Sequence, residues 1–173
     1  TRPKQRTDFG TIFELMTELA AAGGILAVHA EDEDLVMHAS RRQHEINETD
    51  LRHMPTVHSS ISEDLAVRRT IRMAEWTGGS IYLMHLSAKE ALSAVRDARS
   101  RSLPVYAETL HHYASFDSSV YERDDGPLFH TYPSLKATED NDALWAGLID
   151  GTVSTVATDA IVCSRDHKMG GRT

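Results

Sequence analysis

The fold is decided by Ile25-Leu26-Ala27-Val28-His29-Ala30-Glu31, by Ile81-Tyr82-Leu83-Met84-His85-Leu86-Ser87, and by Val153-Ser154-Thr155-Val156-Ala157-Thr158-Asp159. In each stretch a short apolar run ends on a group that can bind a metal or a proton. Such runs, rich in branched side chains and bounded by turn residues, predict strands buried on both faces. Each strand would then present one polar side chain at its carboxyl end, where parallel α/β sheets and barrels build active sites.

Helical patterns alternate with these strands and with a further predicted strand over 104–109. We expect helices over 9–22 with Asp8 as N-cap, over 35–46, over 60–76, from Ser87 through Ala98, and over 139–149. Capping boxes are predicted at Ser60-Ile61-Ser62-Glu63 and Ser87-Ala88-Lys89-Glu90. The last of these helices is expected to bury Leu144, Trp145, Leu148 and Ile149. This alternation predicts a parallel sheet with right-handed crossovers, and four strands cannot close a barrel.

Composition narrows the class of protein. With 173 residues and 40% hydrophobic content, the chain can form one domain with a real core. Its 18 Lys and Arg against 26 Asp and Glu give a net charge of -8, which argues against a nucleic-acid partner. The single cysteine, Cys163, excludes an internal disulfide framework, and it lacks an evident base that would make it a nucleophile. No apolar run reaches the length of a membrane span, so we expect a soluble cytoplasmic protein without a membrane partner.

Three residues are the candidate site: His29, His85 and Asp159. Two imidazoles and a carboxylate suit zinc or another borderline divalent metal. Because the three are far apart in the sequence, only the fold can bring them together. A single histidine at a strand end is more often a structural, hydrogen-bonded residue, but three such residues at equivalent strand ends favour a site.

The ordered motifs carry a resemblance. The set comprises Val28-His29-Ala30-Glu31, Met84-His85-Leu86-Ser87, the strand over 104–109 leading into His112-Tyr113, and Ser154-Thr155-Val156-Ala157-Thr158-Asp159, with support from the stretches 71–78 and 144–151 and from Arg2-Pro3-Lys4. In this order they resemble the dihydropyrimidinase and D-hydantoinase family of the amidohydrolase superfamily. The similarity covers nearly the whole chain, and the ordered set is specific although each motif alone is weak.

The resemblance implies an α/β fold that is a portion, about strands five to eight, of a metal-dependent (β/α)8 TIM-type barrel. Residues 1–173 would be a single partial barrel domain, truncated at both ends. In this family two metals, usually zinc, share a carbamylated lysine. His29 and His85 match the histidines on one metal, and Asp159 matches the carboxylate that binds the other and transfers a proton. Tyr132 matches the substrate loop. The implied reaction opens a cyclic amide ring, such as a hydantoin or a dihydropyrimidine, in a full-length homotetramer.

Some family features are missing or changed. By this register the first-strand His-x-His pair and the bridging lysine lie upstream of Thr1, and Lys4 is expected to be an ordinary surface lysine. The chain begins without Met, so we expect a fragment of a longer protein that is inactive alone. Ala160 replaces a frequent histidine. The loop reads Tyr132-Pro133-Ser134-Leu135-Lys136 where many relatives have Ser-Pro-Pro-Leu-Arg, which leaves ring specificity open.

Other polar residues are given lesser roles, and two alternatives stay open. We expect Glu31 to orient His29, His111 and His112 to border the site, and a solvated face or subunit contact for four further histidines, His38, His44, His53 and His58. One alternative is a non-catalytic scaffold protein with the same barrel. The other is a related cyclic amidohydrolase that opens an allantoin or dihydroorotate ring.

Overall fold

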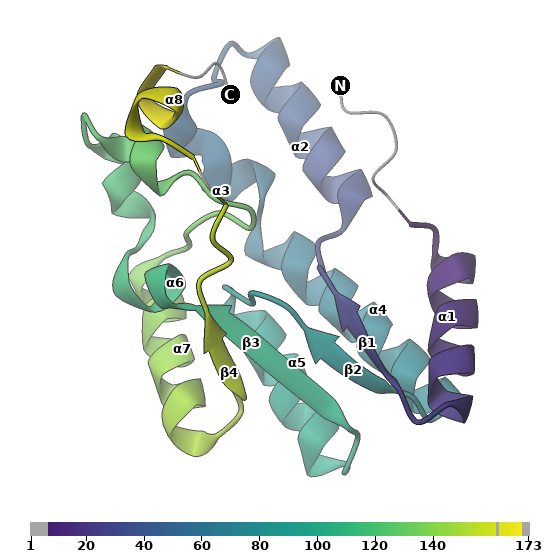
Figure 1. Ribbon diagram of the computed structural model, residues 1–173. Helices are drawn as coiled ribbons and strands as arrows, with labels where there is room; N and C mark the ends of the chain where they lie inside the picture. Colours follow the sequence, from purple (N-terminus) through teal and green to yellow (C-terminus); the bar gives the residue numbers. More distant parts are fainter. Residues whose placement is uncertain (1–6, 162, 171–173) are drawn as a thin grey trace.

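A parallel sheet forms the centre of the computed structural model, which describes residues 7–161 and 163–170. Its strands are β1 (Ile25–Val28), β2 (Ser80–Leu83), β3 (Val105–Leu110) and β4 (Thr155–Ala157), in the spatial order β1-β2-β3-β4 (Figure 1). All neighbouring pairs are parallel, with Leu26 opposite Ile81 and Ile81 opposite Val105. The predicted parallel order is therefore confirmed. The predictions for Arg2-Pro3-Lys4, including that of a surface position for Lys4, fall outside the described residues.

Helices connect the strands as predicted. They are α1 (Phe9–Ala21), α2 (Glu33–Glu45), α3 (Met54–Val57), α4 (Ser60–Thr77), α5 (Lys89–Ser100), α6 (His111–Ser115), α7 (Thr138–Asp150) and α8 (Arg165–Gly170), with 3-10 turns η1 (Leu51–His53), η2 (Ser118–Glu122) and η3 (Gly126–Phe129). Asp8 caps α1 by accepting a hydrogen bond from the amide of Thr11. In the part of the chain that the structure describes, no helix is long and apolar enough to cross a membrane.

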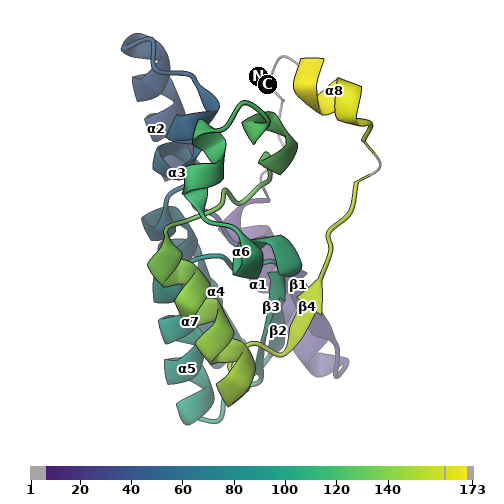
Figure 2. The same cartoon turned by 90° about the vertical axis from the view of Figure 1, so that its left-hand side faces the viewer.

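The core lies between the sheet and one layer of helices. Figure 2 shows α4, α5 and α7 together on one side of the strands. Ile81 and Leu83 of β2 face this layer and are fully buried, as are Leu92 and Val95 of α5. The side chain of Tyr106 points to the opposite face and is 45% exposed. One face of the sheet is thus closed by helices and the other is open.

The prediction that the strands are buried on both faces is wrong, most clearly for the edge strands β1 and β4. Ile25 is 46% exposed and Val156 is 52% exposed. These strands are the two edges of the sheet among the described residues, and helices cover only one face. Open edges and an uncovered inner face are what a partial barrel would show.

Three local predictions are corrected by tertiary contacts. Neither capping box forms: Glu63 turns inward to accept hydrogen bonds from Ser87, and the first amide of α5 donates instead to Asp140. In α7, Leu144 is buried, but Trp145 and Ile149 are 54% and 85% exposed. The physical reason is that α7 packs against α5 and α6 but leaves Ile149 uncovered, and that Trp145 lies at the margin of this contact, with its indole N–H donating to the carbonyl oxygen of Ala114.

Candidate metal site

Two histidines meet at the carboxyl ends of neighbouring strands. His29 follows β1 directly, and His85 lies two residues beyond β2. Because Val28 is opposite Leu83 in the parallel register, the following residues emerge at the same edge of the sheet. Nδ1 of His29 lies 3.0 Å from Nε2 of His85, and the two ring centroids are 4.7 Å apart. The structure therefore brings together His29 and His85, two of the three predicted ligands.

His85 occupies a constrained position. Its backbone φ is +40°, in the left-handed region that non-glycine residues rarely adopt, and only 5% of the residue is exposed. Its amide donates to Oε1 of Glu108 at 3.2 Å. The other ring nitrogen, Nδ1, is buried and has no hydrogen-bond partner among the described residues. Burial, and then the charge of His29, lower the pKa of His85, so its neutral form is favoured.

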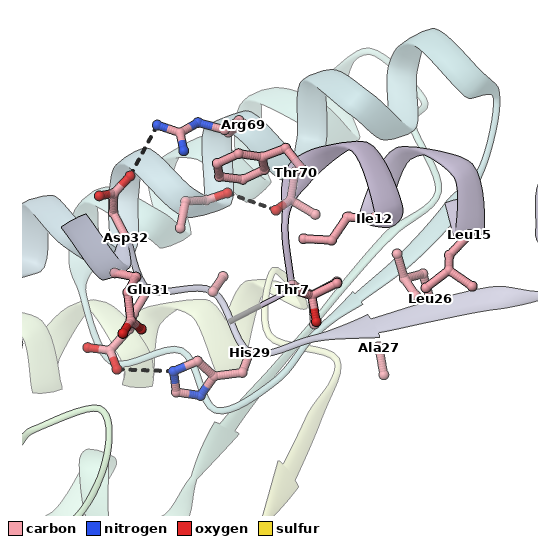
Figure 3. Close-up of a pocket in the computed structure, with 15 residues that line it drawn as sticks. Thr7, Ile12, Leu15, Leu26, Ala27, His29, Glu31, Asp32, Arg69 and Thr70 are labelled. Carbon is pink, nitrogen blue, oxygen red and sulfur yellow. Dashed lines mark hydrogen bonds and ion pairs between the residues drawn. The ribbon is translucent and has the colours of Figure 1, made fainter. Parts of the chain in front are cut away.

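Glu31 lies between two imidazoles. Its carboxylate accepts from Nε2 of His29 at 3.1 Å and from Nδ1 of His58 at 2.9 Å. Figure 3 shows the contact between Glu31 and His29 as a dashed line. Burial alone would raise the pKa of Glu31, but the hydrogen bonds from the two histidines outweigh it and lower the pKa to about 2. Glu31 is thus placed to orient His29, as expected.

This contact determines the tautomer of His29. When Nε2 carries the proton that Glu31 accepts, Nδ1 presents its lone pair toward His85. Burial lowers the pKa of His29, but the hydrogen bond and the charge of Glu31 more than offset this, and the net pKa is raised. A carboxylate behind a ligating histidine is a common arrangement at metal sites.

The prediction for His58 is wrong. Instead of lying on a solvated face, its side chain is only 13% exposed and pairs with Glu31. His38 and His44 are exposed on α2, as expected, and His53 lies 3.7 Å from Glu48. No periodicity or spacing singled out His58, because its partner lies 27 residues earlier and only the fold brings the two together.

Asp159 lies near the pair of histidines without touching it. It stands two residues beyond β4, is exposed, and has a φ of +43°. Its charge favours the protonated form of both His29 and His85, but it makes no hydrogen bond to either ring. Across residues 7–161 and 163–170, no group of three or more His, Cys, Asp or Glu side chains has a geometry that could hold a metal ion. Of the three predicted ligands, His29 and His85 are therefore in contact, and Asp159 lies nearby without a hydrogen bond to either ring.

Residues after β3 and in the loop before α7 surround this pair. Burial, and then the charge of His111, lower the pKa of His112 to about 4. His111 lies within 3.4 Å of the carbonyl oxygen of Ala157. The Tyr132 ring packs against His58, with centroids 4.7 Å apart, and is 49% exposed. Tyr132 therefore borders the Glu31 and His58 side of the site, and its role toward substrate stays a prediction.

A groove of about 540 Å³ runs along β1 beside α1 and α4 (Figure 3). Its walls include Ile12, Leu15 and Leu26, and His29 and Glu31 lie among its lining residues. His85 does not line it. The groove follows β1, and of the two paired imidazoles only His29 borders it.

The fold and the paired histidines define a class: a parallel β/α barrel segment with a candidate metal site at the carboxyl ends of its strands. Comparisons with known proteins agree with this class. The chain is 31% identical over 165 residues to a dihydroorotase from Staphylococcus aureus and 34% identical over 152 residues to one from Shouchella clausii. These matches cover 91% and 87% of this chain but only 36% and 34% of the relatives. No protein-family model matches.

Comparison with solved structures also supports a barrel segment of this class. A D-hydantoinase from Bacillus sp. AR9 matches with a TM-score of 0.92 at 23% identity, over 98% of this chain and 38% of that one. A dihydropyrimidinase from Brevibacillus agri matches with a TM-score of 0.88 at 25% identity, over 91% of this chain and 35% of that one. These relatives are cyclic amidohydrolases, and the predicted resemblance and fold are confirmed. The chain spans about a third of their length.

Proposed function

We propose that this chain is part of a metal-dependent hydrolase that opens a cyclic amide ring. The observation that carries the proposal is the 3.0 Å approach of His29 Nδ1 to His85 Nε2 at the carboxyl ends of neighbouring parallel strands. The similarity to dihydroorotases, D-hydantoinases and dihydropyrimidinases supports the reaction class.

The donor set fits zinc. Two nitrogens bound tetrahedrally at the usual zinc distances are about 3.3 Å apart, close to the separation seen here. A bound divalent metal would supply Lewis acidity toward a ring carbonyl and toward water.

The surrounding residues have distinct roles in this proposal. Glu31 keeps the proton of His29 on Nε2 and so leaves Nδ1 free to bind. Asp159 would help to hold a second metal and would pass a proton to the leaving ring nitrogen. Tyr132, exposed beside His58, contacts the substrate. Two metals with a bridging lysine would need ligands from outside this chain, so we propose a partial barrel that is inactive alone.

A dihydroorotate ring is the second candidate substrate. Sequence relatives at 30–34% identity include dihydroorotases, whereas similar solved structures include hydantoinases and a dihydropyrimidinase. Hydantoin, dihydropyrimidine and dihydroorotate rings each contain a cyclic amide bond that such an enzyme can hydrolyse. A scaffold role is less well supported, because it gives no reason for two imidazoles to face one another. A cytoplasmic location and a homotetramer in the full-length protein remain proposals.

Zinc titration of the 173-residue chain tests the site. We expect zinc to shift the imidazole nitrogen resonances of His29 and His85, and His29→Ala or His85→Ala to weaken binding at least tenfold. His44→Ala, on the exposed face of α2, is the matched control. Equal zinc binding by wild type and His85→Ala would refute the site. Hydantoin, dihydrouracil and dihydroorotate hydrolysis should be at background for the chain alone, and full activity would contradict the assignment of strands five to eight.

A further inference from the structure

Glu63 is a fully buried carboxylate that ends on the turn beside His85. From α4 it accepts hydrogen bonds from the amides of Ser87 and Ala88, both at 2.9 Å, and from the Ser87 hydroxyl at 2.6 Å. Burying a carboxylate is costly unless hydrogen bonds and an opposite charge compensate it. All three donors belong to one turn, so Glu63 restrains that turn directly.

The restrained turn is the one that presents His85. The preceding side of the turn is bound by β3: Glu108 accepts from the His85 amide through its side chain and from the Leu86 amide through its carbonyl, at 3.2 and 2.7 Å. The left-handed backbone of His85 is unfavourable for a residue with a Cβ, and it persists only where neighbours over-determine it. Glu63 and Glu108 together supply that restraint from both sides.

Lys136 completes the environment of Glu63. Its side chain is buried, with Nζ donating to the carbonyl oxygens of His58 at 2.6 Å and Ser134 at 3.2 Å. The positive charge of Lys136 acts on Glu63 and partly offsets the burial that disfavours its ionised form. The same lysine therefore links the carboxylate to the loop that carries Tyr132 and to His58.

We propose that Glu63 is a positioning residue that holds His85 with Nε2 turned toward His29; this inference rests on the proposed metal site. It acts through the Ser87–Ala88 turn and touches neither metal nor substrate. Groups that hydrogen-bond directly to a metal ligand typically contribute about 10-fold to 100-fold to metal affinity, and because Glu63 acts one step further away, through the turn, we expect an effect near the lower end of that range.

The substitution Glu63→Gln tests the proposal in the full 173-residue chain. Glutamine keeps one oxygen for the two amides but carries no charge, and its NH₂ group can only donate to the Ser87 hydroxyl, so the charge-assisted bond from that hydroxyl is lost and the turn is held less tightly. Asp140→Asn is the matched control, because Asp140 is also buried and accepts the amides of Lys89 and Ala137 beyond this turn. Two readouts are used: nuclear Overhauser contacts between the His29 and His85 rings without metal, and zinc affinity by calorimetry.

We expect Glu63→Gln to lose the ring-to-ring contacts and to bind zinc at least tenfold more weakly, with the Asp140→Asn control within twofold of wild type. Unchanged contacts and affinity in Glu63→Gln would overturn the positioning role. If that variant does not fold, Ser87→Ala removes only the hydroxyl bond, and we expect a twofold to fivefold loss; no change there would also overturn it. If His85→Ala binds zinc as tightly as wild type, the metal site is refuted. In that case the contacts between the His29 and His85 rings, measured without metal in Glu63→Gln, still test the positioning role of Glu63.

Discussion

Replacement of Glu31 should remove a pH-dependent part of the stability. The Glu31 side chain is 5% exposed and accepts hydrogen bonds from His29 and His58. Its pKa falls from the ordinary 4.5 to about 2 on folding. At about 1.4 kcal/mol per unit, this shift stabilises the folded state by about 3 kcal/mol above the unfolded pKa. Because the folded pKa is the lower one, the stabilisation is present above pH 4.5 and is lost as the pH falls toward 2.

Urea unfolding from pH 6 to pH 2.5 measures this effect. Relative to Glu31→Gln, wild type should lose about 2 kcal/mol by pH 3, which is most of the expected difference. Glu75→Gln is the control, since Glu75 lies on the helical surface paired with Arg72 and Arg101. Parallel pH profiles for wild type and Glu31→Gln would refute the reasoning, because they would mean that Glu31 is not held ionised between the two imidazoles.

Three further predictions concern the site, the core and a helix end. Removing zinc with a chelator should reverse the shifts of the His29 and His85 nitrogens and leave the far-ultraviolet circular dichroism unchanged, because strand pairing and the apolar core, rather than the two histidines, hold the sheet together; unfolding on chelation would contradict this. Leu92→Ala should lower the free energy of unfolding by about 2–5 kcal/mol, measured in urea, because Leu92 is fully buried between α5 and the sheet. Gly78→Ala should lower the free energy of unfolding by about 1–2 kcal/mol in the same assay. Gly78 ends α4 with a φ of +69°, and an added Cβ would meet no neighbouring atom, so only backbone strain would act. An unchanged free energy of unfolding would disprove that cause.

Strand and helix positions could be read from local pattern. The apolar runs at 25–28, 81–83 and 105–110 become neighbouring parallel strands, because branched apolar residues between turn residues have few alternatives. Charged residues near helix starts were less informative. Glu63 has the spacing of a capping box, yet it reaches Ser87 instead, because a partner brought close by the fold competes with the local amides.

The site divides in the same way. Its two histidines could be predicted, since each follows an apolar strand and parallel strands end at one edge. Glu31 was a weaker prediction, supported only by its proximity to His29 in the sequence. His58 could not be found, because its role depends on Glu31, and nothing local distinguishes it from exposed histidines such as His44.

By itself the sequence determined that the strands are parallel, that His29 and His85 end two of them, and that the chain resembles one part of a cyclic amidohydrolase barrel. Periodicity and strand-end position are local properties, so they are readable without coordinates. Only the tertiary structure decided which ring nitrogens face each other, that Glu31 joins His29 to His58, and that Glu63 is buried against the His85 turn. Those contacts join residues far apart in the chain, and they are determined by side-chain packing between elements, which a linear pattern does not encode.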